Sequence, residues 1–127
     1  MSMKRRVYYH DTDCAGVVYY GNYLKFLEEA RTEYMEERGL SVKALLDAGF
    51  GFVVKRQEID YKYPARYGDT VEIATRVTEV TPFRARFEYD LKNQEGRMLA
   101  RAVTDMVCVG PDLRMKEMAP ELSGRLR

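Results

Sequence analysis

The chain has 127 residues, and its 21 lysines and arginines nearly balance 20 aspartates and glutamates, for a formal net charge of +1. This length predicts one domain whose core is large enough to need no disulfide or structural metal. Nucleic acids and anionic membranes are bound through an excess of clustered basic residues. The near-neutral charge therefore argues against either as a main partner.

Residue types that often carry catalysis are scarce. The sequence holds one histidine, His10, and two cysteines, Cys14 and Cys108. A Ser-His-Asp hydrolase and a multi-histidine metal site are therefore disfavoured. No signal-peptide core follows the basic start, so we expect a cytoplasmic protein with free thiols. No apolar run reaches the roughly 20 residues of a membrane-spanning helix.

In chain order, Lys4–Tyr9 is expected as a first strand and Asn22–Glu37 as an amphipathic helix. The apolar residues of that helix recur at helical spacing: Tyr23, Phe26, Leu27, Ala30 and Tyr34. Gly39 follows at the position of a left-handed C-terminal cap. Ser41 is a candidate N-cap for a short second helix, Val42–Ala48.

From Gly51 onward, apolar and polar residues alternate with the period of half-buried strands. The clearest strand places five apolar residues on one face: Phe83, Ala85, Phe87, Tyr89 and Leu91. Turn residues interrupt the pattern at Pro64–Asp69, Thr81–Pro82 and Asn93–Gly96. The last strand, Arg97–Val109, has apolar residues on both faces, so we expect it to be central or covered on both sides.

These elements predict an α+β fold, in which one five-stranded antiparallel sheet buries its apolar face on the long helix beside a short second helix. Residues 1–127 form this single domain, and about residues 111–127 are expected as a polar tail with one short helical turn. One helix cannot cover both faces and both edges of such a sheet. The sequence therefore predicts a homo-oligomer.

The densest chemistry lies between the first strand and the long helix, from Tyr8 to Tyr23. This stretch holds the only histidine, two aspartates, one cysteine and five tyrosines. The start of a helix offers free backbone N–H groups and the positive end of the helix dipole. Such a loop suits a phosphate or a developing oxyanion.

The polar side chains of this loop also have structural interpretations. Asp13 precedes a glycine at short spacing, where aspartate often closes a turn with its own backbone, and Asp11 has the same two interpretations. His10 is a candidate general base, although a single histidine after a strand is more often packed or on the surface. A Cys14–His10 nucleophile pair is the weakest alternative, because these residues need not face each other.

The loop tyrosines can line an acyl pocket or fill the interface between helix and sheet. Seven basic residues fall mostly on the polar faces of the expected strands: Lys55, Arg56, Lys62, Arg66, Arg84, Arg86 and Arg101. We expect them to be solvated, and a few are candidates to bind the phosphates of a nucleotide-bearing substrate. No P-loop, dinucleotide fingerprint or CxxC motif is present.

The motifs of this loop resemble the opening of the 4-hydroxybenzoyl-CoA thioesterase family: Tyr9, Asp11-Thr12-Asp13, Gly16-Val17-Val18-Tyr19, Asn22-Tyr23 and Glu29-Ala30-Arg31. Within it, the chain is most similar to bacterial acyl-CoA thioesterases of the YbgC type, which are associated with the Tol-Pal system. Later segments extend the resemblance to nearly the whole chain: Phe52-Val53-Val54, Tyr63-Pro64-Ala65-Arg66-Tyr67-Gly68-Asp69 and Val107-Cys108-Val109.

The resemblance implies a hotdog fold, in which the sheet wraps the long helix, and dimers or tetramers with active sites at subunit interfaces. It implies an acyl-CoA thioesterase that needs no metal or other cofactor. The catalytic residues are then Asp13, as general base or nucleophile, and Tyr20, whose backbone N–H polarises the thioester carbonyl. The substrate-binding residues are expected to be Gly16, Val18, Tyr19, Tyr23, Phe52 and Val53.

Other functions remain open. A module or scaffold could bind acyl-CoA, acyl-carrier protein or Tol-Pal-associated partners without cleaving the thioester. A dehydratase or isomerase is disfavoured, because such relatives use a catalytic histidine and His10 lies outside the expected place.

Overall fold

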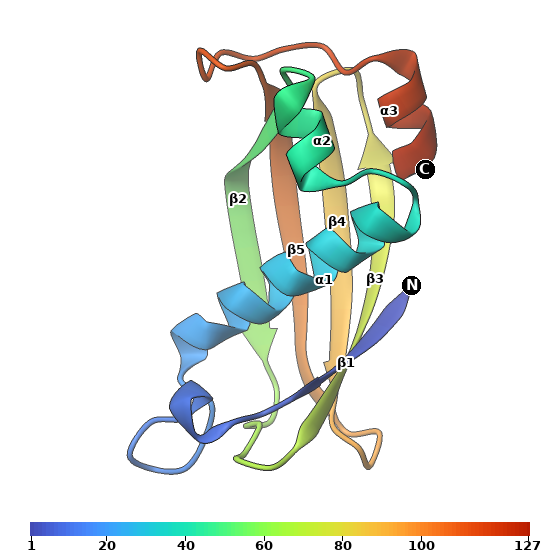
Figure 1. Cartoon of the computed structure of the whole chain (residues 1–127). Helices are drawn as coiled ribbons and strands as arrows, with labels where there is room; N and C mark the ends of the chain where they lie inside the picture. The colour runs from blue at the N-terminus through green and yellow to red at the C-terminus, as the bar shows by residue number, and fades with distance from the viewer.

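The computed structural model describes all residues, 1–127. Five strands form one antiparallel sheet in the order β1-β3-β4-β5-β2 (Figure 1). Their bounds are β1 (Ser2–Arg6), β2 (Gly51–Tyr61), β3 (Thr70–Val80), β4 (Arg84–Lys92) and β5 (Met98–Val109). The strands β1 and β2 are therefore the two edges of the sheet.

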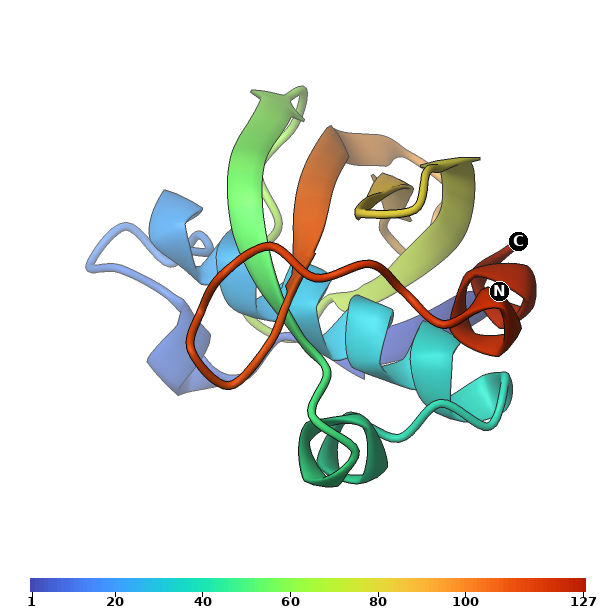
Figure 2. The ribbon, with the colours of Figure 1, turned by 90° about the horizontal axis from the view of Figure 1, so that it is seen from above.

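Helices and short turns complete the chain: α1 (Tyr23–Glu37), α2 (Val42–Asp47), α3 (Pro120–Leu126) and the 3-10 turns η1 (Tyr9–Asp11) and η2 (Tyr20–Asn22). The sheet curves around α1, and α2 lies beside the end of β2 at which that strand begins (Figures 1 and 2). None of these helices has the length and apolar character needed to cross a membrane.

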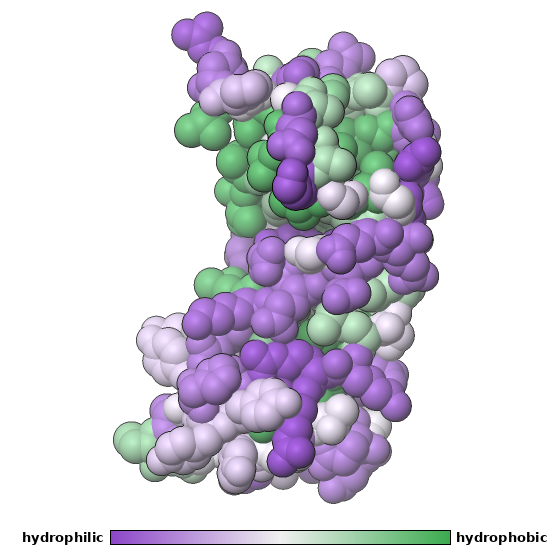
Figure 3. Space-filling view, viewed as in Figure 1, coloured by the Kyte–Doolittle hydropathy of each residue, from purple (hydrophilic) through white to green (hydrophobic).

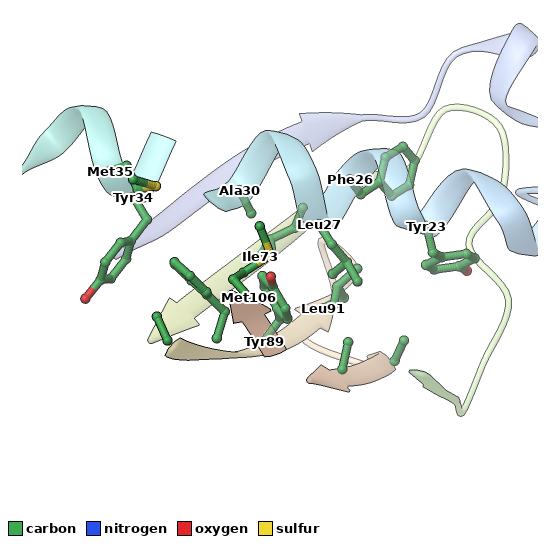
Figure 4. Close-up of a cluster of buried hydrophobic side chains, with 14 of the residues drawn as sticks. Tyr23, Phe26, Leu27, Ala30, Tyr34, Met35, Ile73, Tyr89, Leu91 and Met106 are labelled. Atoms are coloured by element: carbon green, nitrogen blue, oxygen red, sulfur yellow. The ribbon is translucent and has the colours of Figure 1, made fainter. Parts of the chain in front are cut away.

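The apolar face of α1 forms the centre of the core. Phe26, Leu27 and Ala30 are fully buried against strand residues that include Ile73 and Tyr89 (Figure 4). Burial of each large apolar side chain contributes about 1.5–3 kcal/mol, so this face holds the helix on the sheet. The alternation predicted for β4 is confirmed by its buried residues: Ala85, Phe87, Tyr89 and Leu91. The prediction was wrong for Phe83, which lies before the start of β4 and is exposed.

The helix boundaries follow the predicted capping residues. The helix α1 begins at Tyr23, one residue after the predicted start, with Asn22 at the N-cap. The Ser41 hydroxyl accepts the Ala44 N–H at 2.9 Å and caps α2, as predicted. Gly39 ends α1 with φ +75°, a left-handed conformation that glycine adopts without a Cβ clash.

The first strand lies earlier than predicted, because β1 begins at Ser2 and ends at Arg6. Pairing with the β3 side continues only to Val7, whose N–H donates to the Asp69 carbonyl at 2.8 Å. The Asp11 carboxylate then accepts the Tyr8 N–H at 2.9 Å, and the chain turns into η1. The apolar pattern predicted a strand up to Tyr9, but a local hydrogen bond between a carboxylate and the backbone ends the strand earlier.

The last strand has the predicted central place, because β5 pairs with β4 on one side and β2 on the other. The C-terminal tail differs from the prediction. Met118, Leu122 and Leu126 are buried in the core, and α3 has seven residues. The Tyr34 hydroxyl also donates to the Leu126 carbonyl at 2.7 Å. These few apolar residues are hidden among charged ones, so composition alone suggested a solvated tail.

A buried ion pair joins β1, the loop after it and α1. Arg5 donates to both carboxylate oxygens of Asp11, which is 2% exposed, and its Nε donates to Glu29 at 3.2 Å. The Asp11 carbonyl accepts the Tyr19 N–H at 3.1 Å and the Asn22 side-chain amide at 2.8 Å. Asp11 therefore ties the entrance of α1 to the first strand.

The environment of Asp11 has opposing effects on its pKa. Burial raises the pKa of the carboxyl, but the Arg5 hydrogen bond, the Tyr8 N–H and the Arg5 charge outweigh it, so the pKa lies below its usual value of 3.8. A depressed pKa contributes stability above the pKa of the unfolded chain, and this contribution is lost as pH falls through the folded value.

We predict that Leu126→Ala lowers the free energy of unfolding by about 2–5 kcal/mol, because it leaves a cavity under α3. Urea denaturation measures the change. The matched control is Arg127→Ala at the exposed neighbouring position, with an expected change within about 0.5 kcal/mol. Equal effects of the two substitutions would show that α3 is not part of the core.

We predict that Asp11→Asn lowers the free energy of unfolding at pH 7 by about 3–5 kcal/mol, because the Arg5 guanidinium loses its buried partner. The wild type should then lose more stability than the variant when pH falls from about 5 to 2, across the range where Asp11 is protonated. Urea denaturation at each pH tests both statements, with the exposed Asp47→Asn as control. Parallel losses in wild type and Asp11→Asn would contradict this account.

Candidate active site

The loop before α1 folds as a small hairpin. The Asp13 N–H donates to the Val17 carbonyl at 2.9 Å, and Thr12 bridges Val18 on the opposite arm. Gly16 forms the turn with φ +79°, and its carbonyl accepts the Tyr67 N–H at 3.3 Å. The hairpin is thus a defined structure that rests on the turn between β2 and β3.

Asp13 has the turn geometry and also a free oxygen. Its Oδ1 accepts the Ala15 N–H at 2.8 Å, which closes the turn expected for aspartate before glycine. The side chain is exposed, and Oδ2 has no hydrogen-bond or ion-pair partner in the chain. The structural interpretation is therefore satisfied by one oxygen, while the other can meet a substrate.

Tyr20 lies where the loop enters the helix. It begins η2, so its N–H has no acceptor one turn earlier within that helix. Its carbonyl accepts the Tyr61 hydroxyl from the end of β2 at 3.1 Å, and α1 follows directly. The positive end of the α1 dipole favours a partial negative charge at this place.

Two of the predicted substrate-binding residues support the loop from inside. Val18 is buried, and its N–H donates to the Ala65 carbonyl at 2.8 Å. The Tyr23 hydroxyl accepts the Ala65 N–H at 3.3 Å, and burial raises the pKa of this tyrosine. Gly16 and Tyr19 lie on the accessible side of the same loop. The chain therefore gathers Asp13, Tyr20 and these four residues at one end of α1.

The other two predicted residues, Phe52 and Val53, lie far from this loop within one chain. Phe52 and Tyr61 are nine positions apart on β2, or about 30 Å at the usual rise of a strand. Phe52 instead lines an apolar cavity of about 290 Å³ between α1, α2 and β2. Exposed apolar side chains gather at the same end of the molecule, around α2 (Figure 3). One chain does not bring all the predicted residues together.

His10 and Cys14 do not form a nucleophile pair. The His10 ring is exposed, stacks on Tyr8 at 6.1 Å between ring centroids and lies 3.5 Å from an Asp11 oxygen. Cys14 is exposed and has no hydrogen bond to His10. The sequence analysis did not identify Tyr61, which holds the Tyr20 carbonyl, because no short spacing links the two residues.

Comparison with known proteins agrees with this architecture. The model of the thioesterase-like superfamily matches residues 7–126. The acyl-CoA thioester hydrolase YbgC of Escherichia coli is 40% identical over 114 residues, 90% of this chain and 84% of the relative. The acyl-CoA thioesterase YbgC of Haemophilus influenzae is 41% identical over 116 residues, 90% of this chain and 83% of the relative.

A solved structure extends the comparison to the fold. The crystal structure of a 1,4-dihydroxy-2-naphthoyl-CoA thioesterase from Synechocystis superposes with a TM-score of 0.90 at 27% identity, over 98% of this chain and 93% of that one. The hotdog fold that the sequence motifs implied is confirmed by this agreement and by the order of helix and strands. The chain therefore belongs to the thioesterase-like superfamily.

Proposed function

We propose that this thioesterase hydrolyses acyl-CoA thioesters to a carboxylic acid and free CoA, with Asp13 as the reacting carboxylate and the Tyr20 N–H at the thioester oxygen. The observation that carries the proposal is the Asp13 carboxylate, which has one oxygen bound to the Ala15 N–H and the other free, on the loop that leads into α1. The YbgC relatives, which are named acyl-CoA thioesterases, support the substrate class.

Asp13 can act in two ways. As a nucleophile, its free oxygen attacks the thioester carbon, CoA leaves as the thiolate, and water then cleaves the acyl–aspartate anhydride and restores the carboxylate. As a general base, it takes a proton from water while that water attacks the carbonyl, and the proton passes to the departing thiolate. A thiol pKa near 8.5 makes CoA a good leaving group, so no strong acid is required.

The Tyr20 N–H supports either route. Negative charge develops on the thioester oxygen when the carbonyl carbon is attacked, and a well-aimed backbone donor stabilises that charge by about 3–4 kcal/mol. The dipole of α1 acts in the same direction. Because the donor is a backbone group, it does not depend on the side chain at this position.

The proposal includes a homodimer formed through the free edge of β2. Val53 and Val54 are 41% and 49% exposed on this edge, and exposed apolar residues on an edge strand favour pairing with another chain. Antiparallel pairing of two β2 strands about their middle would place Phe52 of the partner subunit opposite Asp60. Phe52 and Val53 would then lie near the loop of the other copy, which completes the predicted site.

Cytoplasmic location is part of the proposal. Both cysteines are free, as a reducing compartment would leave them.

We predict that Asp13→Asn lowers kcat for acyl-CoA hydrolysis by about 10²–10⁴, because the amide can neither attack the thioester nor accept the proton from water. A thiol-trapping assay with short, long and aromatic acyl-CoAs measures the rates. Asp112→Asn is the matched control, since Asp112 caps a similar exposed turn by accepting the Arg114 N–H at 3.0 Å. The control should keep wild-type rates.

Two results would contradict the proposal. If Asp13→Asn hydrolysed acyl-CoA at the wild-type rate, the role assigned to this carboxylate would be wrong. Tight binding of acyl-CoA without thiol release by the wild type would instead identify a binding module.

We predict that the wild type sediments as a dimer and that Val53→Asp raises the dissociation constant at least about tenfold, because symmetry brings two introduced carboxylates to one interface. Analytical ultracentrifugation measures this constant. Ser2→Asp adds the same charge to the opposite edge of the sheet, on β1, and should leave the dimer unchanged. A monomeric wild type, or equal effects of both variants, would reject the β2 interface.

A further inference from the structure

Tyr61, the last residue of β2, connects the sheet to the residue that carries the proposed oxyanion donor. Its hydroxyl donates to the Tyr20 carbonyl at 3.1 Å, across 41 positions of the sequence. Its ring meets the Tyr23 ring edge to face, with 5.2 Å between the two ring centroids. The end of β2 therefore contacts both Tyr20 and the first residue of α1 (Figure 1).

Tyr20 has few other restraints. Its side chain is 64% exposed and contacts the ring of Tyr19, which is itself exposed. The Tyr20 carbonyl also accepts the Tyr23 N–H, but that bond lies within the same turn at the start of the helix. The Tyr61 hydroxyl is thus the only group of the sheet that is hydrogen-bonded to Tyr20.

A bond at the Tyr20 carbonyl affects the N–H of the same residue in two ways. Because each residue has only two soft backbone torsions, fixing the carbonyl restricts the directions in which the N–H can point. The hydroxyl also places the positive end of its O–H dipole on the carbonyl oxygen, and so reduces the repulsion between that oxygen and a nearby developing anion. Donors that are oriented before the charge develops stabilise an oxyanion most effectively.

The surroundings of Tyr61 keep its hydroxyl in place as a donor. Burial, and then the nearby Tyr20, raise the pKa of the Tyr61 hydroxyl above its usual value of 10.0, so it stays protonated at neutral pH. The Tyr23 ring on which Tyr61 packs is 3% exposed, and the Tyr23 hydroxyl accepts the Ala65 N–H at 3.3 Å. Tyr61 therefore rests on a fixed part of the core.

We propose that Tyr61 is a positioning residue for thioester hydrolysis, which holds Tyr20 so that its N–H points at the thioester oxygen. The inference rests on the proposed hydrolysis and gives the end of β2 a role in the same site. Negative charge on the thioester oxygen develops only as the carbonyl is attacked, so this role acts on kcat and leaves KM nearly unchanged.

The substitution Tyr61→Phe tests the proposal, because it removes the hydroxyl and keeps the ring. We expect kcat for the best substrate of the acyl-CoA panel to fall about tenfold, the loss expected for one hydrogen bond, while KM changes less than about twofold. Unchanged kcat, or a rise in KM alone, would overturn the proposal.

Tyr34→Phe is the matched control. The Tyr34 hydroxyl also donates to a backbone carbonyl, that of Leu126, at 2.7 Å, but this bond lies near the other end of α1. The control loses the same type of bond and should keep the wild-type kcat. Equal losses of kcat in the two variants would show a general effect of stability and would overturn the role of Tyr61.

NMR relaxation tests the positioning of Tyr20 without turnover. In the wild type, the order parameter of the Tyr20 N–H should be about 0.85, as in rigid backbone, and in Tyr61→Phe it should fall below about 0.6. Tyr34→Phe should keep the wild-type value, and the amide spectrum shows that each variant is folded. An unchanged order parameter in Tyr61→Phe would overturn the positioning role even if kcat falls.

The two assays separate this inference from the proposed function. If the wild type cleaves no acyl-CoA, the proposed hydrolysis is wrong, and the order parameter alone decides whether Tyr61 holds Tyr20. If the wild type is active and Tyr61→Phe loses order at Tyr20 but keeps kcat, the hydrolysis stands and the role of Tyr61 in it is wrong.

Discussion

The buried ion pair between Arg5 and Asp11 is the interaction on which the candidate site depends. It connects the first strand to the loop, and Arg5 extends the connection to Glu29 on α1. The backbone of Asp11 meanwhile accepts from Tyr19 and Asn22 at the helix entrance. A loop that carries reactive groups must be held within narrow limits, and a network with buried, satisfied members provides that rigidity.

The topology of the sheet separates the predicted site residues within one chain. It leaves β2 as an edge, with the loop that holds Asp13 near one end of the strand and the apolar cavity at the other. The two ends of an eleven-residue strand lie far apart within one chain. A two-fold axis through the middle of the strand would place the opposite ends of two copies side by side. The proposed dimer and the proposed site therefore both depend on the same exposed edge.

Capping residues and apolar periodicity predicted the elements that depend on interactions within a few residues. The caps at Gly39 and Ser41, the limits of α1 and the alternation in β4 all follow from hydrogen bonding or burial within a few residues. Prediction was less accurate where a distant contact dominates. The strand β1 ends early because Asp11 captures the backbone, and α3 is helical because three scattered apolar residues reach the core.

By itself, the sequence determined an α+β fold with one long helix and motifs of a thioesterase family, and it predicted candidate catalytic residues in the loop before that helix. The loop pattern left Asp11 and Asp13 with the same two interpretations, and only the family resemblance favoured Asp13 as the catalytic residue. The tertiary structure shows how their environments differ: Arg5 reaches Asp11 from another element and buries it, while Asp13 stays in solvent with one oxygen free. The contacts of Arg31 with Tyr89 and Thr104 likewise join residues that are 58 and 73 positions apart, so no spacing in the sequence could indicate them.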